Sequence, residues 1–287
     1  MSREIALNTV VIYHANCPDG FTAAWVAYRK FGPGLTFFPA HYGEEPPCVR
    51  GQRVYILDFS YKRPVMRQIL SSAYSVTVLD HHKTAEAELD GIVDEFMMRP
   101  DLIANPPGSE LPVVCFNMEK SGARLAWEHF FPGEPVPWFV QYVEDRDLWR
   151  WKLPDSREIN AAIGSYPWSF ELWDIWQADP RFLTQLAEEG VAIERYKKQQ
   201  VENICQHATE IEMDGHKILA VNTTVQFSEV AGKLAEGRPF GAAWFVRSDG
   251  KKQWSLRSRD GGVDVSEVAK RRGGGGHRNA AGFEEAA

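Results

Sequence analysis

The chain has 287 residues, of which 44% are hydrophobic and 25% charged. This composition is typical of a soluble globular protein, and the length favours two domains. The sequence has no run of about 18 apolar residues and no apolar signal segment, which excludes a membrane-spanning protein. Its four isolated cysteines favour reduced thiols, so a cytoplasmic protein is expected. The net charge of −7 argues against the wrapping of long nucleic acid, although the segment from Arg247 to Arg278 is basic, with nine Lys/Arg and four Asp/Glu.

Short β-rich runs alternate with helical stretches in the first part of the chain. Strands are expected over residues 9–14, 53–59, 75–79 and 111–116, with helices over residues 21–31 and after Pro64. Strands that alternate with helices indicate βαβ units. The pattern therefore predicts an α/β domain over residues 1–180, with a mostly parallel sheet flanked by helices.

The second part of the chain begins with helical patterns over residues 122–131 and 137–148. A long polar helix follows over residues 181–211, and its thinly spread apolar positions predict a linker helix, assigned to residues 181–212. Strands over 216–224, 241–248 and 251–259, with helices over 228–234 and 265–272, predict a smaller α/β domain over residues 213–287.

Polar residues stand at the carboxyl ends of the expected strands, where open α/β sheets bind ligands. They are His14, Asp19, Asp58, Asp80, His81 and His82, and a later helix closes with Asp145 and Asp147. Each has a structural explanation when taken singly, such as helix capping by Asp58. Together they indicate a cation site, because carboxylates that face one cleft repel one another unless a cation lies between them. An oxygen-rich set with a few imidazoles favours manganese, magnesium or iron over zinc.

Two motifs resemble those of a known family. VLDHHK, at residues 78–83, resembles the signature of the DHH phosphoesterases, and RGGGGHRNAAGF, at residues 272–283, resembles the glycine-rich motif of their DHHA1 companion domain. ILDF and EDRDLW lie between them in the expected order. The resemblance spans nearly the whole chain. It implies a DHH metal-binding catalytic domain, a DHHA1 substrate-binding domain and a usually manganese-dependent phosphoester hydrolase.

The resemblance also implies roles for individual residues. The implied metal ligands are His14, Asp19, Asp58, His81 and Asp145, the last of these preferred to Asp147. Asp58 would bridge two manganese ions, with His14 on the first and the other ligands on the second. Asp80 and His82 are the implied catalytic residues: Asp80 would orient ligands through hydrogen bonds, and His82 would face the scissile phosphate. The chain departs from the family's DxDG pattern at Cys17, so the first ion either loses an oxygen ligand or gains a thiolate.

The C-terminal part would bind the substrate. By resemblance, its phosphate or terminal nucleotide would be held by Arg257, Ser258, Gly275, Gly276 and His277, with Arg259, Arg272 and Arg278 as candidates for further contacts. Glycine lets backbone N–H groups approach an anion closely, because it has no Cβ. The tryptophans crowded between Trp138 and Trp176 are interpreted as core residues, with a base-stacking platform as the alternative.

These observations predict a manganese-dependent phosphodiesterase or phosphatase, with magnesium or another divalent ion as an alternative cofactor. The expected substrates are small: oligoribonucleotides of a few residues, dinucleotides or nucleoside bisphosphates, cleaved by attack of metal-activated water on phosphorus. Hydrolysis of polyphosphate or pyrophosphate is an alternative, as is a non-catalytic nucleotide-binding module if Cys17 prevents metal occupancy. A nuclease for long nucleic acid is least favoured, because the acidic body offers no evident track for a strand.

Overall fold

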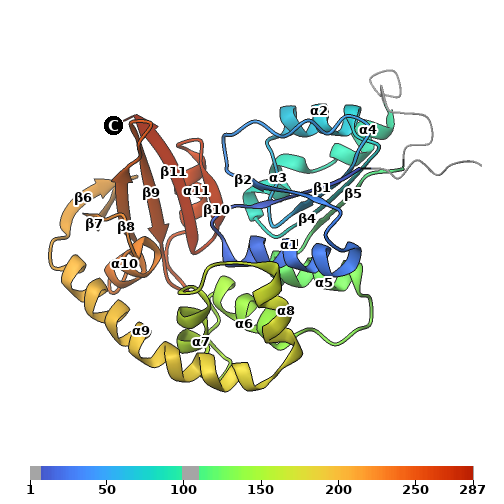
Figure 1. Ribbon diagram of the computed structural model, residues 1–287. Helices are drawn as coiled ribbons and strands as arrows, with labels where there is room; N and C mark the ends of the chain where they lie inside the picture. Colours follow the sequence, from blue (N-terminus) through green and yellow to red (C-terminus); the bar gives the residue numbers. More distant parts are fainter. Residues whose placement is uncertain (1–7, 99–109, 287) are drawn as a thin grey trace, which may run out of the picture. The chain divides into compact units, whose positions relative to one another are not determined.

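The computed structural model describes residues 8–98 and 110–286. The chain divides into an N-terminal unit, residues 1–191, and a C-terminal unit, residues 192–287 (Figure 1). Residues 1–7 of the expected catalytic domain, residues 99–109 and residue 287 lie outside the described part.

The N-terminal unit is built on a parallel sheet of five strands. They are β1 (Thr9–His14), β2 (Thr36–Ala40), β3 (Arg53–Leu57), β4 (Ser75–Asp80) and β5 (Val113–Phe116), in the order β2-β1-β3-β4-β5. The predicted parallel α/β fold is thus confirmed. Strand β2 was not predicted, because its sequence TFFPA contains Pro39. A proline is tolerated there because β2 is an edge strand.

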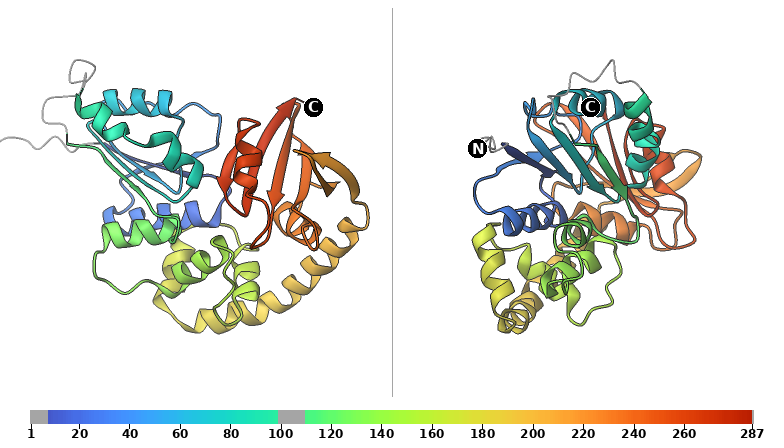
Figure 2. Two further views of the ribbon diagram at one scale, coloured as in Figure 1. Left: turned by 180° about the vertical axis from the view of Figure 1, so that it is seen from behind. Right: turned by 90° about the vertical axis from the view of Figure 1, so that its right-hand side faces the viewer.

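Helices cover both faces of this sheet (Figures 1 and 2). On one face lie α1 (Pro18–Phe31) and α5 (Gly122–Phe130), and on the other lie α2 (Arg63–Ser72), α3 (Lys83–Leu89) and α4 (Ile92–Met98). Alternate strand residues such as Ile12, Ile56 and Val78 are fully buried and belong to one cluster with Met66 and Ile69 of α2. Burial of these side chains holds the strands in register, so the strand ends are fixed relative to one another.

Three further helices follow: α6 (Trp138–Asp147) and α8 (Phe170–Ala178) pack against α1, and α7 (Ser156–Ile163) packs against α6. Trp173 and Trp176 of α8 are only 0% and 1% exposed, and the indole N–H of Trp173 donates to Thr22 Oγ1 at 3.1 Å. These two tryptophans are core residues, as interpreted from the sequence. Trp149, which follows α6, is 45% exposed and does not share that role.

Helix α9 (Arg181–Cys205) ends six residues before the expected position, Ile211. The reason is that β6 (Thr209–Met213) pairs antiparallel with β7 (His216–Asn222). Asp214 and Gly215 form the turn between them, both with positive φ. The boundary between the two units falls within α9, and the assignment of residues 181–212 as a linker remains a prediction.

The C-terminal unit is a mixed sheet of six strands with two short helices and the second part of α9, which confirms the smaller α/β domain. The further elements are α10 (Phe227–Leu234), β8 (Gly241–Val246), β9 (Lys251–Arg257), α11 (Val265–Lys270), β10 (Gly275–His277) and β11 (Ala280–Ala286). The strand order is β10-β11-β9-β8-β7-β6, in which only β7 and β8 are parallel. Trp254, Leu256 and Phe283 of the sheet form a core with Val265 and Val268 of α11.

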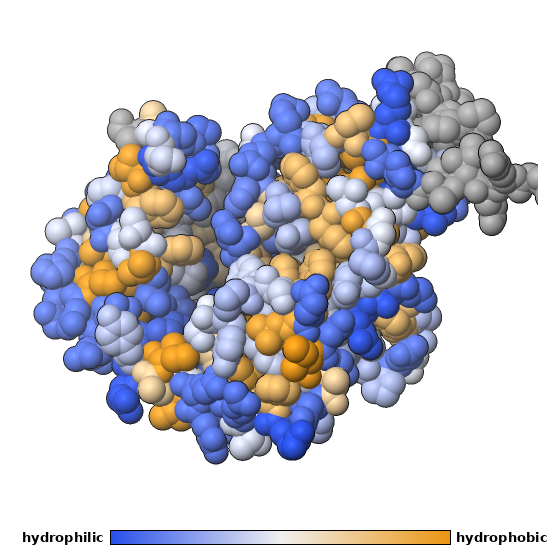
Figure 3. All heavy atoms as spheres, in the orientation of Figure 1, coloured by the Kyte–Doolittle hydropathy of each residue, from blue (hydrophilic) through white to orange (hydrophobic). Residues whose placement is uncertain are grey.

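The surface seen in Figure 3 mixes hydrophilic side chains with separate apolar patches in both units. Isolated exposed apolar residues are normal for folded proteins. Among the described residues, no helix combines the length and the apolar character needed to cross a bilayer.

Candidate metal centre

The carboxyl ends of three neighbouring strands bring most of the predicted ligands together. β1 ends at His14, Asp58 directly follows β3, and β4 ends at Asp80 before His81 and His82. Because β1, β3 and β4 are adjacent and parallel, these ends meet at one edge of the sheet.

Asp58 lies at the middle of this group and is 1% exposed. Its Oδ1 is 3.0 Å from His81 Nε2, and its Oδ2 is 3.4 Å from His14 Nδ1. The two oxygens of one carboxylate therefore face two different imidazoles. The residue has a left-handed backbone with φ of 54°, a conformation that aspartate tolerates better than bulky residues do.

Asp19 reaches the group from the start of α1. Its carboxylate accepts hydrogen bonds from the backbone N–H groups of Gly122 and Ala123 at 2.6 and 3.0 Å, at the N-terminus of α5. Its Oδ2 is also 3.8 Å from His81 Nε2. A Cβ on Gly122 would lie 2.4 Å from the Cβ of Asp58, so glycine is required for this close approach. The sequence pattern alone did not single out Gly122.

The structure changes one predicted ligand. Asp145 was preferred, but its carboxylate accepts backbone N–H groups from Lys152 and Leu153, at 2.9 to 3.3 Å, and so holds the loop that follows α6. Asp147 Oδ2 instead lies 3.3 Å from His81 Nε2. Asp147 therefore replaces Asp145 in the candidate ligand set. Because the two aspartates are only two residues apart at a helix end, the sequence alone does not show which of them is the ligand and which supports the loop.

Asp80 is completely buried and orients the histidine pair. Its Oδ1 accepts from His82 Nδ1 at 2.7 Å and from the backbone N–H groups of His81 and His82, at 2.7 and 3.3 Å. Its Oδ2 accepts from the hydroxyl of Ser60 at 2.8 Å. Since a carboxylate only accepts, Nδ1 of His82 carries a proton in this arrangement. Ser60 was missed by the sequence analysis.

The buried carboxylates carry more negative charge than the nearby side chains balance. Burial opposes ionisation of Asp58, but its interactions with the imidazoles of His14 and His81 outweigh burial and hold the pKa of Asp58 well below its usual range. Burial and the charges of Asp58 and Asp147 raise the pKa of Asp19 well above its usual range. Burial lowers the pKa of His81, but Asp147 and Asp58 overcome this effect and raise it to about 10. A cation bound among these groups would therefore displace protons from them.

The donor atoms fit divalent cations. One set of Asp19, Asp58 and His81 and a second set of His14, Asp58 and His82 each place three donor atoms within 4.8 Å of one another. Within residues 8–98 and 110–286, neither Oδ2 of Asp58 nor Oδ2 of Asp147 has a hydrogen-bond partner, although both atoms are buried. A bound cation stabilises buried carboxylate oxygens that accept no hydrogen bond. Asp58 belongs to both sets.

Cys17, where the chain departs from the DxDG pattern, caps the start of α1 beside this centre. Burial, followed by the negative charges of Asp58, Asp147 and Asp19, raises the pKa of its thiol well above the usual range. The neutral thiol is a weak ligand, since metals bind the thiolate.

The predicted substrate-binding residues lie at one end of the C-terminal sheet. Arg257 of β9 pairs with Ala280 of β11, which pairs with His277 of β10. Paired residues on neighbouring strands point to the same face, so Arg257 and His277 share a face two strands apart. The Arg257 guanidinium donates to Ser228 Oγ at 2.6 Å, and Ser258 Oγ lies 3.2 Å from Asn279 Oδ1.

Part of the glycine run has a packing role. A Cβ on Gly274 would lie 2.1 Å from the carbonyl oxygen of Gly282, and Gly276 has φ of 137°. Gly275 and Gly276 are not a free loop, because they pair with β11 as strand β10. Arg272, a candidate for further contacts, is paired with Asp214 at 2.5 Å.

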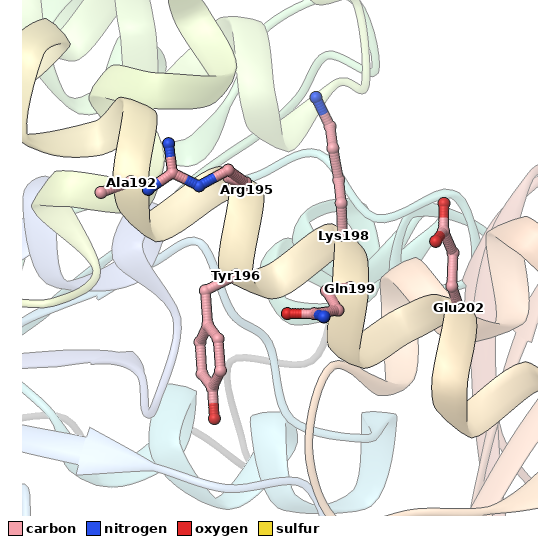
Figure 4. A pocket seen from close by; sticks show the side chains of 6 residues that line it. All are labelled: Ala192, Arg195, Tyr196, Lys198, Gln199 and Glu202. Carbon is pink, nitrogen blue, oxygen red and sulfur yellow. The ribbon is translucent and has the colours of Figure 1, made fainter.

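A separate shallow pocket of about 480 Å³ runs along α9 and contains none of the predicted site residues. Figure 4 shows that its lining side chains all come from this helix. A single helix surface with exposed side chains such as Tyr196 offers no converging chemistry.

Comparison with known proteins assigns the family. A DHHA1 domain is recognised over residues 217–285, and an alignment of 167 positions, gaps included, shows 25% identity to oligoribonuclease NrnB of Bacillus subtilis (strain 168). The chain belongs to the DHH superfamily, with a C-terminal DHHA1 domain. The NrnB similarity covers 53% of this DHH protein and 40% of NrnB.

Further similarities span most of the chain. Uncharacterized protein R106 of Acanthamoeba polyphaga mimivirus is 29% identical over an alignment of 298 positions, gaps included, that covers 96% of this chain and 66% of R106. The chain thus spans less than two thirds of the length of either curated relative. Among solved structures, the pGpG-specific phosphodiesterase PggH of Vibrio cholerae is 14% identical with a TM-score of 0.46, covering 97% of this chain and 93% of PggH. An uncharacterized protein of Helicobacter pylori G27 is 13% identical with a TM-score of 0.40 and the same coverage.

Proposed function

We propose that this DHH protein is a metal-dependent phosphoester hydrolase that acts on short nucleotide substrates. The observation that carries the proposal is the position of Asp58, whose buried carboxylate belongs to two sets of potential metal ligands at once. A carboxylate shared in this way suits a pair of cations, and paired cations are a common device for hydrolysis of phosphoesters.

Asp58 would hold both ions, one with His14 and the other with Asp19, His81 and Asp147. Manganese fits this set of carboxylate oxygens and imidazole nitrogens better than zinc does. Divalent cations held there would supply Lewis-acid chemistry, activating water for attack on phosphorus and offsetting charge on the phosphoryl oxygens.

Asp80 and His82 would assist through hydrogen bonding. Asp80 fixes Nδ1 of His82 at 2.7 Å and thereby sets the direction of the ring. Burial lowers the pKa of His82, but Asp80 overcomes this effect and raises it, which favours the imidazolium form. With Nδ1 engaged, a protonated His82 would donate from Nε2 to a phosphoryl oxygen. A donor held in place before the reaction stabilises developing charge without a cost of reorganisation.

The C-terminal unit would bind the rest of the substrate. Arg257 and His277 lie on one sheet face, two strands apart, as expected for side chains that contact one phosphate or adjacent phosphates. The name of NrnB, an oligoribonuclease, supports nucleotides as the substrate class. These contacts, like the identity of the metal, form part of the proposal.

The test is hydrolysis by the full chain after chelation and addition of manganese or magnesium. The substrates are a dinucleotide, a nucleoside bisphosphate, polyphosphate and a 20-residue oligonucleotide. We expect manganese to restore hydrolysis of the dinucleotide or the bisphosphate, and Asp58→Asn to lose it. Asp94→Asn is the matched control, since Asp94 is exposed on α4.

Two results would contradict the proposal. Activity that survives verified metal removal would refute the dependence on metal. Turnover of polyphosphate or of the 20-residue strand alone would refute the short-nucleotide substrate class.

A further inference from the structure

Tyr42 lies at the same sheet edge as the metal centre but belongs to none of the candidate ligand sets. It follows β2 by two residues, and the last pair of the β1–β2 register joins His14 to Ala40. This register places Tyr42 just beyond the carboxyl end of β2, next to His14.

The Tyr42 ring is held by three aromatic neighbours. Its centroid is 4.7 Å from that of Phe59, with 33° between the ring planes. It lies 5.4 Å from the ring of His14 and 6.2 Å from that of His82, both nearly edge to face. Phe59 is completely buried, so it provides a fixed support for the tyrosine.

In spite of these contacts, Tyr42 is 48% exposed. Two other large aromatic residues of the described N-terminal unit are similarly exposed, Phe31 at 40% and Trp149 at 45%. The ring contacts of Phe31 are with Tyr55 and Phe130, whereas those of Trp149 are with Trp151. Within the described residues of this unit, Tyr42 is the exposed aromatic whose ring contacts candidate site residues. Packing against Phe59 accounts for the buried side of the Tyr42 ring, but it does not account for the exposed side.

A nucleobase is the ligand that suits an exposed ring in this position. His14 and His82 share a ligand set with Asp58, so a phosphate bound there would lie beside the ring. A nucleotide carries a flat base attached to that phosphate through a sugar. Bases stack on exposed aromatic side chains, and a ring already fixed by its neighbours loses little entropy on binding.

We propose that Tyr42 stacks on the base of the nucleotide whose phosphate binds at the metal centre. The inference rests on the proposed function and deepens it, because it makes Tyr42 a residue that selects nucleotides over polyphosphate. The ring, rather than the hydroxyl group, provides the contact.

The experiment compares the binding of AMP and ribose 5-phosphate in the presence of manganese, by titration calorimetry. These probes share a phosphate and a sugar and differ in the base. The variants are Tyr42→Leu, which removes the ring, and Tyr42→Phe, which keeps it. Tyr196→Leu is the matched control: Tyr196 is 60% exposed and extends from α9 (Figure 4). Manganese content is measured in each protein, because Tyr42 touches His14.

We expect Tyr42→Leu to weaken AMP binding by about 5- to 150-fold, the range for loss of one stacked base. Ribose 5-phosphate should bind the same in all the proteins, and Tyr42→Phe and Tyr196→Leu should bind AMP as the native chain does. Three results would overturn the inference. They are unchanged AMP binding in Tyr42→Leu, equal loss for both probes, and a loss in Tyr42→Phe as large as in Tyr42→Leu.

Hydrolysis of the dinucleotide pApA by the native protein separates this inference from the proposed function. If the native chain cleaves pApA while Tyr42→Leu binds AMP normally, only the role of Tyr42 fails. If the native chain cleaves no phosphoester, the proposed function fails. Equal affinity of the native chain for AMP and ribose 5-phosphate would refute the stacking contact in either case.

Discussion

Replacement of Gly122 by alanine tests the close packing on which the metal centre depends. The backbone N–H of Gly122 donates to Asp19 at 2.6 Å, and the residue starts α5 against Asp58. An added Cβ would lie 2.4 Å from the Cβ of Asp58 and 2.8 Å from its Oδ1. Ordinary contact begins at 3.4 Å, so α5 and Asp58 would have to separate by about 1 Å. This movement would displace either Asp58 or the hydrogen bonds that hold Asp19.

The expected size of the effect follows from that displacement. Overpacking of this kind costs about 1–3 kcal/mol of folding free energy. A catalytic group misplaced by about 1 Å can cost roughly 100-fold in rate. We therefore expect Gly122→Ala to unfold at lower urea concentration, to bind manganese more weakly and to lose about 100-fold in kcat/KM.

Gly34→Ala is the matched control for this experiment. An added Cβ at Gly34 has no atom within 4 Å, so the variant should resemble the native protein in all three measurements. The packing argument is refuted if Gly122→Ala matches Gly34→Ala in urea stability and metal affinity. Loss of stability with unchanged metal affinity would show that Asp58 and Asp19 keep their positions in spite of the substitution.

Three further predictions concern single side chains. Asp147→Asn should lose manganese. Asp145→Asn should keep manganese and lose about 1–3 kcal/mol of stability, since Asp145 supports the loop after α6. Metal analysis and urea unfolding of both variants test this, and the reverse pattern would restore Asp145 as the ligand. Cys17→Ser should leave manganese stoichiometry unchanged and Cys17→Asp should raise affinity, since a hard oxygen suits manganese; loss of metal in the serine variant would identify a thiolate ligand. Hydrogen bonds from two arginines lower the pKa of Asp214, so its contribution to stability is present above about pH 4 and is lost as the pH falls through the folded-state pKa. The stability gap between the native chain and Asp214→Asn should therefore narrow below about pH 4, and a gap that stays constant from pH 7 to pH 3 would contradict this.

The fold class could be predicted from local sequence patterns, which do not depend on contacts with distant parts of the chain. Buried strands such as β1 and β3 are continuous apolar runs, and the helices between them have helical periodicity, so the parallel sheet could be predicted. Strand β2 was missed because Pro39 is acceptable only at an edge position, and the edge is set by the rest of the sheet. The predicted helix over residues 181–211 extended past the observed end of α9 at Cys205, because residues 209–213 form a strand only through pairing with β7.

The candidate site was predictable only in part, for similar reasons. Polar residues at strand ends converge once the strands are parallel and adjacent, so His14, Asp58 and His81 could be grouped from the sequence. The choice of Asp147 over Asp145 depends on which side of the end of α6 faces His81, and two neighbouring aspartates do not encode this. Tyr42 could not be found, because its approach to His14 depends on the unpredicted strand β2.

The most direct test of the central claim is the manganese stoichiometry of the native chain and of Asp58→Asn, measured by equilibrium dialysis, with circular dichroism to confirm folding. If the Asp58 carboxylate is shared by two cations, the native chain should bind two manganese ions. The Asp58→Asn variant should remain folded and bind at most one ion, weakly, because a neutral amide is a poor bridge between two cations. Two ions bound with native affinity by folded Asp58→Asn, or none bound by the native chain, would contradict the account.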